Sequence, residues 1–397
     1  MPHSQRIAVI GGGPAGLRAA ELAVQADAQV TVYDSMRSVG RKFLVAGKGG
    51  LNLTHGESFQ DFINRYTGPD LPATQWRGML EAFDAQALRQ WAAELGVETF
   101  EASSGRIYPK ALKAAPLLRR WITRLKASGV RFEMNHRWSG LQPGSPHQLT
   151  FSNGATVEAE AVIFALGGGS WPQTGSTGTW IETFRALGIA CHPLQAANCG
   201  WEHAWPEKVL NAAEGEPIKN ITVSADGHEV SGELMLTRYG LEGGAIYQLG
   251  KTLREMPQPV IHIDFKPSFS HAQLVAKMES VKRDFLNEAK TRWRLGAAAH
   301  AILSQQPWHD AESLATATKH CMIPLTGPRP IAEAISSAGG VCWTELDENL
   351  MLKRYPGLFV AGEMIDWEAP TGGYLMQACF ATGTRAGQAA ARFLTDK

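Results

Sequence analysis

The chain has 397 residues, of which 44% are hydrophobic and 19% charged, a composition typical of a globular protein of two or three domains and not of a disordered chain. Lys and Arg together number 38, as do Asp and Glu, so net charge gives no sign of the positive field typical of nucleic-acid or anionic-membrane binding. The five cysteines show no C-x-x-C spacing, which argues against a zinc site or a complete disulfide framework, and we predict no metal site.

The N-terminal segment has the pattern of a βαβ unit. Arg6 to Ile10 is an apolar strand, and a helix and a second strand at Gln29 to Tyr33 follow the glycine run Gly11 to Gly16. The run reads G-x-G-x-x-G, which permits a tight turn, a close approach of a pyrophosphate and close packing of helix on strand. Asp34 ends the second strand, where a carboxylate accepts hydrogen bonds from an adenosine ribose. We therefore predict dinucleotide binding here.

The next segments combine helices with short strands. Helical spacing of apolar residues predicts helices within 75–96 and 114–128. Short strands are predicted within 130–138 and 148–151, followed by a hairpin turn at 152–154. The continuous apolar run Ala161 to Leu166 is typical of a strand buried on both faces of a parallel sheet, and it ends in three glycines.

From about residue 191 to 341 the pattern changes to antiparallel strands. We expect strands at 218–225, 229–237 and 259–265, with Asp226-Gly227 as a turn, and a charged helical block from there to about residue 306. No apolar run reaches the roughly 18 residues of a membrane span, and the N-terminus lacks the pattern of a signal peptide. We expect a cytoplasmic protein.

The C-terminal segment returns to the earlier pattern. An apolar strand at 358–361 meets Gly362, and the glycine-rich segment Pro370 to Ala378 leads into a final helix over about 375–394. Free amides at such a helix start offer a second place to bind an extended cofactor. An ordinary turn with a helix cap is the alternative.

Several motifs together resemble the BaiN/YhiN-like family of FAD-dependent oxidoreductases, also called aminoacetone oxidase family flavoproteins. They are Gly11 to Gly16 with Asp34, Gly40 to Thr54, Gly105 to Ala111, Ala165 to Pro172, Leu236 to Gly244, and Gly362-Glu363 with Gly372 to Ala378. The segment Gly47 to His55 reads GKGGLNLTH, which resembles a subgroup that lacks the arginine and cysteine of the commoner GGGRCN form. Chemistry that depends on those two residues is not carried over.

The resemblance implies an α/β fold with a Rossmann-type, glutathione-reductase-like FAD-binding domain and an inserted β-rich domain that carries a helical excursion. The expected domains are a discontinuous FAD-binding domain at 1–190 and 342–397, the β-rich insert at 191–265 and 307–341, and a helical subdomain at 266–306. A substrate cleft is expected where the insert faces the flavin.

The resemblance and the glycine turns also imply a set of residues that bind the cofactor. These are Gly11, Gly13, Pro14, Ala15, Gly16, Asp34, Ser35, Lys42, Gly47, Asn52, Thr54, Ala165, Gly167, Gly168, Gly362, Glu363, Gly372, Gly373, Gln377 and Ala378. The candidate catalytic residues are Tyr108 and Tyr239 as proton donors and Arg106 as a group that binds an anionic or carbonyl-bearing substrate, each with a structural role as its alternative.

The function expected is hydride transfer between FAD and a small or medium organic substrate, by reduction of a conjugated ketone or enoate or by oxidation of an amine. No second G-x-G-x-x-G unit is present, so NADPH or NADH is expected to act as a transient electron donor, with oxygen or a partner flavoprotein as alternatives. Two other functions stay open: a flavin-dependent RNA uridine reductase, which neutral charge does not favour, and a flavin-binding sensor without catalysis. Oligomeric state does not follow from the sequence.

Overall fold

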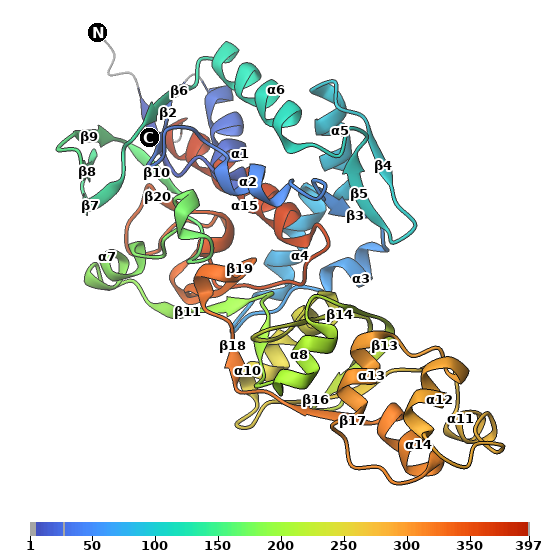
Figure 1. The fold of residues 1–397 in the computed structure, drawn as a ribbon. Helices are drawn as coiled ribbons and strands as arrows, with labels where there is room; N and C mark the ends of the chain where they lie inside the picture. The colour runs from blue at the N-terminus through green and yellow to red at the C-terminus, as the bar shows by residue number, and fades with distance from the viewer. Residues whose placement is uncertain (1–4, 27, 396–397) are drawn as a thin grey trace. The chain divides into compact units, whose positions relative to one another are not determined.

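A computed structural model describes residues 5–26 and 28–395 and divides them into two compact units. The first unit holds the described residues up to Gln195 and from Ser336 onward, and the second comprises Ala196–Ile335. Both are shown in Figure 1. The divisions lie within six residues of the expected domain limits at 190 and 342, and we keep the proposed division into three domains as a prediction.

A five-stranded parallel sheet forms the centre of the first unit. Its strand order is β20-β10-β1-β2-β6, and every neighbouring pair is parallel. The strands are β1 (Arg6–Ile10), β2 (Gln29–Asp34), β6 (Arg131–Met134), β10 (Ala161–Phe164) and β20 (Leu358–Val360). In chain order, β1, β2 and β6 lie side by side toward one edge of the sheet, and β10 then lies on the other side of β1. This arrangement confirms the predicted Rossmann-type fold, since it is a doubly wound sheet with a switch point between β1 and β10.

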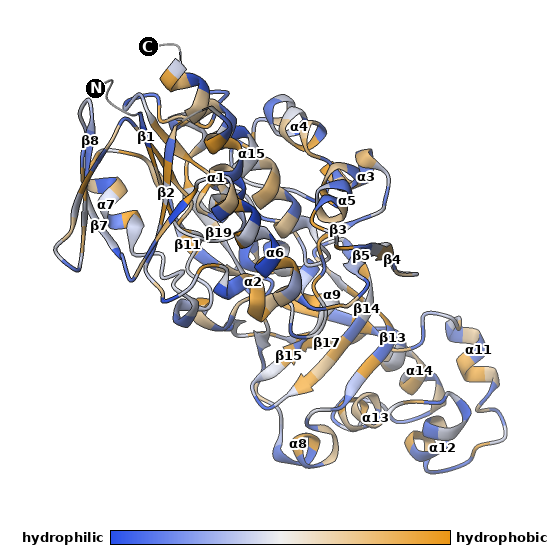
Figure 2. Cartoon of the chain, turned by 90° about the horizontal axis from the view of Figure 1, so that it is seen from above, coloured by the Kyte–Doolittle hydropathy of each residue, from blue (hydrophilic) through white to orange (hydrophobic). Residues whose placement is uncertain are grey.

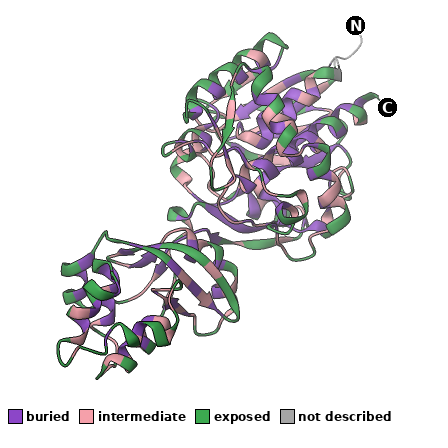
Figure 3. Ribbon diagram, turned by 90° about the vertical axis from the view of Figure 1, so that its right-hand side faces the viewer, coloured by how far each residue is buried: buried purple, intermediate pink, exposed green. Residues whose placement is uncertain are grey.

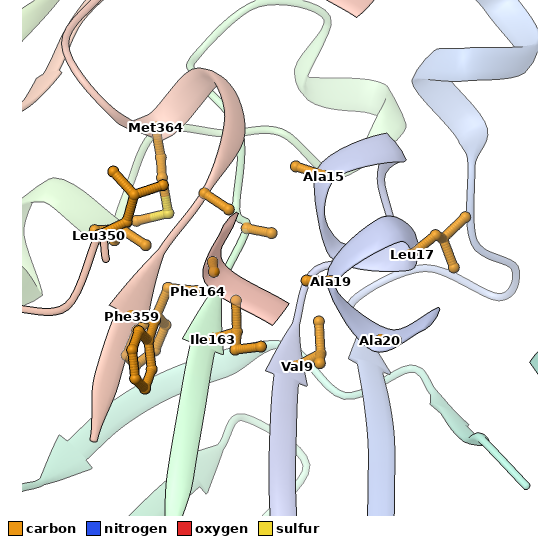
Figure 4. Close-up of a cluster of buried hydrophobic side chains, with 14 of the residues drawn as sticks. Val9, Ala15, Leu17, Ala19, Ala20, Ile163, Phe164, Leu350, Phe359 and Met364 are labelled. Carbon is orange, nitrogen blue, oxygen red and sulfur yellow. The ribbon is translucent and has the colours of Figure 1, made fainter. Parts of the chain in front are cut away.

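Burial explains the apolar sequences of these strands. All residues of β10 and β20 are buried, as parallel strands covered on both faces require. The hydrophobic colouring of β1 in the same sheet is visible in Figure 2. The close-up in Figure 4 shows Val9, Ile163 and Phe359 on three neighbouring strands, with Ala15 and Ala19 of a helix beside them. Figure 3 shows buried residues in the interior of each unit and exposed residues along its outer surfaces.

Two helices from opposite ends of the chain pack together through small residues. They are α1 (Pro14–Ala23) and α15 (Tyr374–Thr395). A Cβ added to Gly383 of α15 would lie 2.4 Å from the carbonyl oxygen of Ala15. A Cβ added to Gly387 would lie 2.4 Å from that of Ala19. The glycines therefore allow the two backbones to touch, and both helices pack on the parallel sheet.

The remaining elements of the first unit surround this core. The helix expected within 75–96 is two helices, because Asp84 caps a new one with its side chain by accepting the amide of Ala87 at 2.8 Å. The strand expected at 130–138 ends at Met134, since Asn135 has a positive φ of 59°. The elements are α2 (Arg41–Ala46), β3 (Thr54–His55), α3 (Phe59–Ile63), α4 (Ala73–Ala82), α5 (Ala85–Glu94), β4 (Thr99–Glu101), β5 (Arg106–Pro109), α6 (Ala114–Ala127), β7 (Trp138–Gln142), β8 (His147–Phe151), β9 (Thr156–Ala159), α7 (Trp180–Ala186), β11 (Cys191–Ala197) and β19 (Ser336–Val341).

The second unit is built on a seven-stranded sheet of order β17-β16-β13-β14-β15-β12-β18, whose neighbouring strands are antiparallel. The turn between its two longest strands is the predicted Asp226-Gly227, and both residues have positive φ, 45° and 77°, as a tight hairpin requires. The strands are β12 (Trp201–Glu202), β13 (Pro217–Ala225), β14 (His228–Thr237), β15 (Gly240–Glu242), β16 (Val260–Asp264), β17 (Cys321–Pro324) and β18 (Gly327–Pro328).

Helices cover this second sheet and share its hydrophobic core. Ile261 and Ile263 of β16 are buried in the same cluster as Trp293 and Ile302 from the helical block. The helices are α8 (Glu207–Ala213), α9 (Gly244–Gln248), α10 (Gly250–Glu255), α11 (His271–Ala276), α12 (Phe285–Arg292), α13 (Ala297–Leu303) and α14 (Ala311–Lys319). Within residues 5–26 and 28–395, none of the helices is both long and apolar enough to cross a membrane.

Candidate cofactor site

Three glycine turns lie at the carboxyl ends of adjacent strands of the parallel sheet. Gly11 follows β1, Gly167 follows β10 and Gly362 follows β20, and the register of the sheet makes these strands neighbours. Each of the three glycines has a positive φ: 108°, 70° and 79°. Ligands of doubly wound sheets bind at the carboxyl ends of the strands beside the switch point. The turns therefore mark the place where a nucleotide is expected.

The glycines of the first turn have separate roles. A Cβ added to Gly11 would lie 2.3 Å from the carbonyl oxygen of Ala165, and one added to Gly16 would lie 1.9 Å from the carbonyl oxygen of Gly11. These two glycines are required by protein packing. Gly13 is the N-cap of α1, and no described atom lies within 4 Å of a Cβ added to it. The open space over Gly13 and the amides of the first turn of α1 are the features that phosphate binding at a helix N-terminus requires.

Asp34 lies at the end of β2, next to this turn. Its Oδ2 accepts the amide hydrogen of Gly12 at 2.8 Å and its Oδ1 accepts that of Met36, also at 2.8 Å. Burial raises the pKa of this carboxyl group, although the two amide bonds act in the opposite direction. A carboxylate has about four acceptor sites. Asp34 therefore keeps acceptor capacity for a ligand's hydroxyl groups while it holds the glycine turn in place.

A polar cluster joins the turns after β10 and β20. Lys42 Nζ lies 3.2 Å from Oε2 of Glu363, 2.9 Å from Oγ of Ser170 and 3.2 Å from Oγ of Ser176. Glu363 also accepts the amides of Gly168, at 3.4 Å, and of Ser337, at 2.9 Å. Lys42 and Glu363, both predicted to bind the cofactor, thus form an ion pair that connects the two turns to α2.

Two buried side chains near the start of α15 have polar atoms without a partner. Among the described residues, Oγ1 of Thr54 and Oε1 of Gln377 make no hydrogen bond, and both residues have no solvent exposure. A Cβ added to Gly373 would lie 2.5 Å from the backbone of Thr54, and the amide of Gln377 donates to the carbonyl of Gly373 at 3.0 Å, so these residues lie close together. Oδ1 of Asn52 is likewise buried without a partner in the described part of the chain. An unsatisfied buried polar atom costs about 1–3 kcal/mol, so these atoms fit a bound polar ligand.

The other predicted cofactor residues lie in the same turns. Pro14 and Ala15 begin α1, Ser35 follows β2, Gly47 caps the end of α2 and Ala165 with Gly168 follows β10. Gly372, with a φ of 136°, precedes Gly373, and Ala378 is buried in the second turn of α15. All of the predicted cofactor-binding residues lie in the first unit.

The candidate catalytic residues lie in both units. Arg106 and Tyr108 belong to β5 of the first unit, where the Tyr108 ring stacks on Phe100 with the ring centres 6.0 Å apart. Tyr239 belongs to the second unit, and its hydroxyl donates to Oε2 of Glu242 at 2.5 Å. Burial, followed by that hydrogen bond and the charge of Glu242, raises the pKa of Tyr239. A raised pKa makes Tyr239 a weaker acid than an ordinary tyrosine.

A cavity of about 240 Å³ lies in the first unit, lined in part by sequence neighbours of predicted site residues but by none of those residues themselves. Its lining combines apolar side chains with three carboxylates and an arginine. Its lining residues are His55, Gly56, Glu57, Phe59, Phe62, Leu80, Asp84, Ala85, Gln86, Arg89, Glu101 and Ile107.

One contact beside the site escapes sequence analysis. The hydroxyl of Tyr374 donates to Oε1 of Glu57 at 2.6 Å, across 317 positions of sequence. The position of Tyr374 directly after two glycines is a signal that could have drawn attention to it, whereas nothing local to Glu57 indicates its partner.

The chain matches the profile of the family described as HI0933-like protein Rossmann domain over residues 5–389. It is similar to the 3-dehydro-bile acid delta(4,6)-reductase of Clostridium scindens, with 28% identity over 97% of this chain and 99% of that protein. It is also similar to the ribosomal RNA dihydrouridine synthase of Escherichia coli, with 23% identity over 93% of this chain and 94% of that protein.

Two solved structures show a likeness in fold. One is a flavocytochrome c3 fumarate reductase, with a TM-score of 0.55 and 14% identity over 99% of this chain and 79% of that one. The other is the 3-ketosteroid-delta4-(5alpha)-dehydrogenase of Rhodococcus jostii RHA1, with a TM-score of 0.53 and 16% identity over 98% of this chain and 97% of that one.

Proposed function

The chain belongs to the HI0933-like family of Rossmann-domain proteins and is an FAD-dependent oxidoreductase, and on that premise we propose that it reduces a conjugated carbonyl compound by hydride transfer. The proposal is supported by the similarity, over nearly the full length of both chains, to a protein named as a reductase of a dehydro-bile acid. A conjugated ketone of medium size is the substrate class with the strongest support. Oxidation of an amine is the alternative within the same chemistry.

The residues of the first unit fit FAD. The open space over Gly13 would admit the pyrophosphate, and Asp34 would accept the hydroxyl groups of the adenosine ribose. The unpartnered atoms of Thr54 and Gln377 would satisfy polar atoms of the cofactor in a water-excluded position. When bound, FAD supplies hydride transfer, and the protein supplies binding, orientation and electrostatics.

The side chains near these segments can act on the substrate. We propose that Arg106 binds a carbonyl or carboxylate of the substrate and that Tyr108 donates the proton that accompanies hydride addition. Both lie on β5, which pairs with β3 through Thr54 and Ile107. Through this register the proposed proton donor lies on a strand that pairs with β3, whose Thr54 hydroxyl has no partner among the described residues.

RNA uridine reduction is the second candidate, because a relative is named as a ribosomal RNA dihydrouridine synthase. The helical block that would contact RNA is partly neutralised by its own acidic residues. Within the block, Arg292 pairs with Glu288 at 2.9 Å. Lys282 and Arg283 are exposed. RNA binding that weakens when Lys282 and Arg283 become Glu and that falls steeply with salt would favour this candidate.

The experiment is anaerobic reduction of purified, flavin-loaded protein with NADH or NADPH, followed by mixing with a 3-keto-4-ene steroid. We expect bleaching of the flavin bands near about 450 nm by one of the two donors and their return upon substrate addition, with a reduced product. Tyr108→Phe is expected to slow reoxidation about 100-fold, within the range for loss of a general acid, with little change in reduction by the nicotinamide.

The contrary outcomes separate the alternatives. Protein that binds no FAD would contradict the assignment of the cofactor. Flavin that is reduced by neither nicotinamide would favour the sensor, and flavin that is reduced only by amines would favour amine oxidation.

A further inference from the structure

Tyr374 begins α15 directly after two glycines that leave the backbone without local constraint. Gly372 and Gly373 have φ values of 136° and 100°, a region that favours glycine, and a Gly-Gly pair has high conformational entropy when unrestrained. The same segment carries Gln377, whose buried Oε1 has no partner among the described residues. Since neither the two glycines nor a hydrogen bond to this atom fixes the segment, other contacts must hold the start of α15 in place.

Tyr374 is held at three points. Its hydroxyl donates to Oε1 of Glu57 at 2.6 Å, and its carbonyl oxygen accepts the hydroxyl hydrogen of Tyr66 at 2.8 Å. Its ring stacks on the His55 ring with centres 5.5 Å apart, and the Phe62 ring lies 5.0 Å away. The first residue of α15 is thus constrained at its hydroxyl, its ring and its backbone.

Glu57 is itself fixed by an arginine. Arg65 donates to Glu57 through two nitrogens, Nε at 3.2 Å and a terminal nitrogen at 2.7 Å, in the two-pronged geometry that makes such pairs rigid. Burial opposes ionisation of Glu57, but the hydrogen bonds of Arg65 and Tyr374 outweigh it and lower the pKa of this carboxyl group. Because an ionised carboxylate only accepts, the hydroxyl of Tyr374 must donate, which sets the direction of the bond.

Glu57 also lies three residues beyond Thr54. The segment from Thr54 to Glu57 and the start of α15 are therefore in contact at two points. The backbone of Gly373 packs against that of Thr54, and Tyr374 donates a hydrogen bond to Glu57. The unpartnered atoms of Thr54 and Gln377 belong to these same two segments. We infer that Glu57, anchored by Arg65, is a positioning residue that acts through Tyr374 to hold the helix start and β3 at the separation that FAD requires. This inference rests on the proposed function, because it assumes that these segments contact FAD.

The test compares Tyr374→Phe with Tyr355→Phe, a matched change in the same unit. Tyr355→Phe likewise removes a partly buried hydroxyl bond, to the carbonyl of Leu187 at 2.7 Å, but that bond lies outside the segments proposed to contact FAD. We measure FAD affinity of the apoprotein, the flavin midpoint potential and the thermal unfolding of each apoprotein. Tyr374→Phe is expected to weaken FAD binding about tenfold and to shift the potential, since a hydrogen bond to a charged group is lost, and Tyr355→Phe is expected to change neither.

Glu57→Gln provides a second variant that keeps an acceptor for Tyr374 but removes the charge, and Glu81→Gln is its control on an exposed pair with Arg77. We expect Glu57→Gln to weaken FAD binding by less than Tyr374→Phe and Glu81→Gln to have no effect. Equal affinity and potential in Tyr374→Phe and Tyr355→Phe would overturn the inference and leave the proposed function intact. Wild-type protein that binds no FAD would overturn both.

Discussion

Gly13 and Gly16 belong to one motif, yet the structure assigns them different constraints. Gly16 is required by the protein, because a Cβ there would overlap the carbonyl oxygen of Gly11 at 1.9 Å. Gly13 faces open space, so its lack of a side chain is required only by what binds there. This contrast is the observation that separates a nucleotide-binding turn from a merely structural one.

Substitution by alanine is expected to weaken FAD binding at Gly13 and to reduce the stability of the apoprotein at Gly16. Gly13→Ala is expected to change the free energy of unfolding of the apoprotein by about 1 kcal/mol or less, as at other helix N-caps, and to weaken FAD binding at least tenfold. Gly16→Ala is expected to destabilise the apoprotein by about 1–3 kcal/mol through overpacking. Chemical denaturation and flavin titration measure the two effects. Gly13→Ala protein that retains full FAD affinity would contradict the phosphate site.

Asp34 predicts a dependence of cofactor affinity on pH. Its pKa is raised by burial, so it takes up a proton at a higher pH than an ordinary aspartate, and a protonated carboxyl group loses acceptor capacity for ribose hydroxyls. FAD affinity is therefore expected to fall as pH decreases through this raised pKa, and Asp34→Asn should show weak binding at all pH values. Asp84→Asn, at a helix cap where asparagine is equally suitable, is the control. A pH profile unchanged by Asp34→Asn would contradict the assignment.

Removal of the Thr54 hydroxyl is expected to keep or raise the stability of the apoprotein and to weaken FAD binding. Its buried hydroxyl has no partner among the described residues, so Thr54→Val removes an unsatisfied group at little cost in shape. We expect the apoprotein to unfold at the same temperature or higher and FAD affinity to fall about tenfold. Calorimetry and flavin titration check both parts. A less stable apoprotein with unchanged affinity would show that the hydroxyl serves the protein alone.

At the scale of elements, the close crossing of α1 and α15 determines where the free amides of α1 lie. The contact is made by the backbones of Ala15 and Ala19 against Gly383 and Gly387. Because Ala15 belongs to the first turn of α1, a displacement of this contact would also displace the start of the helix at which we propose that the phosphates bind. We therefore expect helix packing and cofactor binding to be coupled.

Gly383→Ala is expected to destabilise the protein by about 1–3 kcal/mol and to weaken FAD binding, because a Cβ would lie 2.4 Å from the carbonyl oxygen of Ala15. Gly78→Ala in α4 is the matched control. No described atom lies within 4 Å of a Cβ at Gly78, so the change is expected to stabilise the helix by up to about 1 kcal/mol. Thermal unfolding of both variants measures the difference. A Gly383→Ala variant as stable as wild type would show that the crossing has room to relax.

At the scale of the whole molecule, the glycine turns come from distant parts of the chain but lie in one unit. Gly11 and Gly362 follow strands that are separated in the sheet only by β10, while the second unit between them in sequence has a hydrophobic core of its own. The second unit contributes no strand to the parallel sheet of the first unit. Cofactor binding is therefore expected to stabilise the first unit selectively.

Amide hydrogen exchange on the full chain tests this expectation. At an FAD concentration of 100 times Kd, binding contributes about 2.7 kcal/mol to the state that binds it, so exchange that depends on unfolding of the first unit should slow about 100-fold. We expect the slowing in α1, β3 and the start of α15 and no change in β13 and β14. Equal slowing in β13 and β14 would show that the second unit also responds to FAD.

The amino-acid sequence by itself determined the βαβ unit, the buried strands β10 and β20, the Asp226-Gly227 hairpin and the family. These features depend on local patterns: runs of buried residues, glycines at positive φ and motifs of fixed spacing. The break of the helix at Asp84 and the end of β6 at Asn135 were not predicted, since each depends on one residue whose local preference competes with a helical or extended neighbourhood.

Only the tertiary structure decided which side chains share the site. It placed the ion pair of Lys42 and Glu363 between two turns and brought Tyr374 to Glu57 across 317 positions. Within the described residues, it also left a buried polar atom of Thr54 and one of Gln377 without a partner. Contacts of this kind depend on how distant elements pack. Sequence patterns do not predict them, because the local conformational preference of a polar residue is the same whether its partner is water, protein or cofactor.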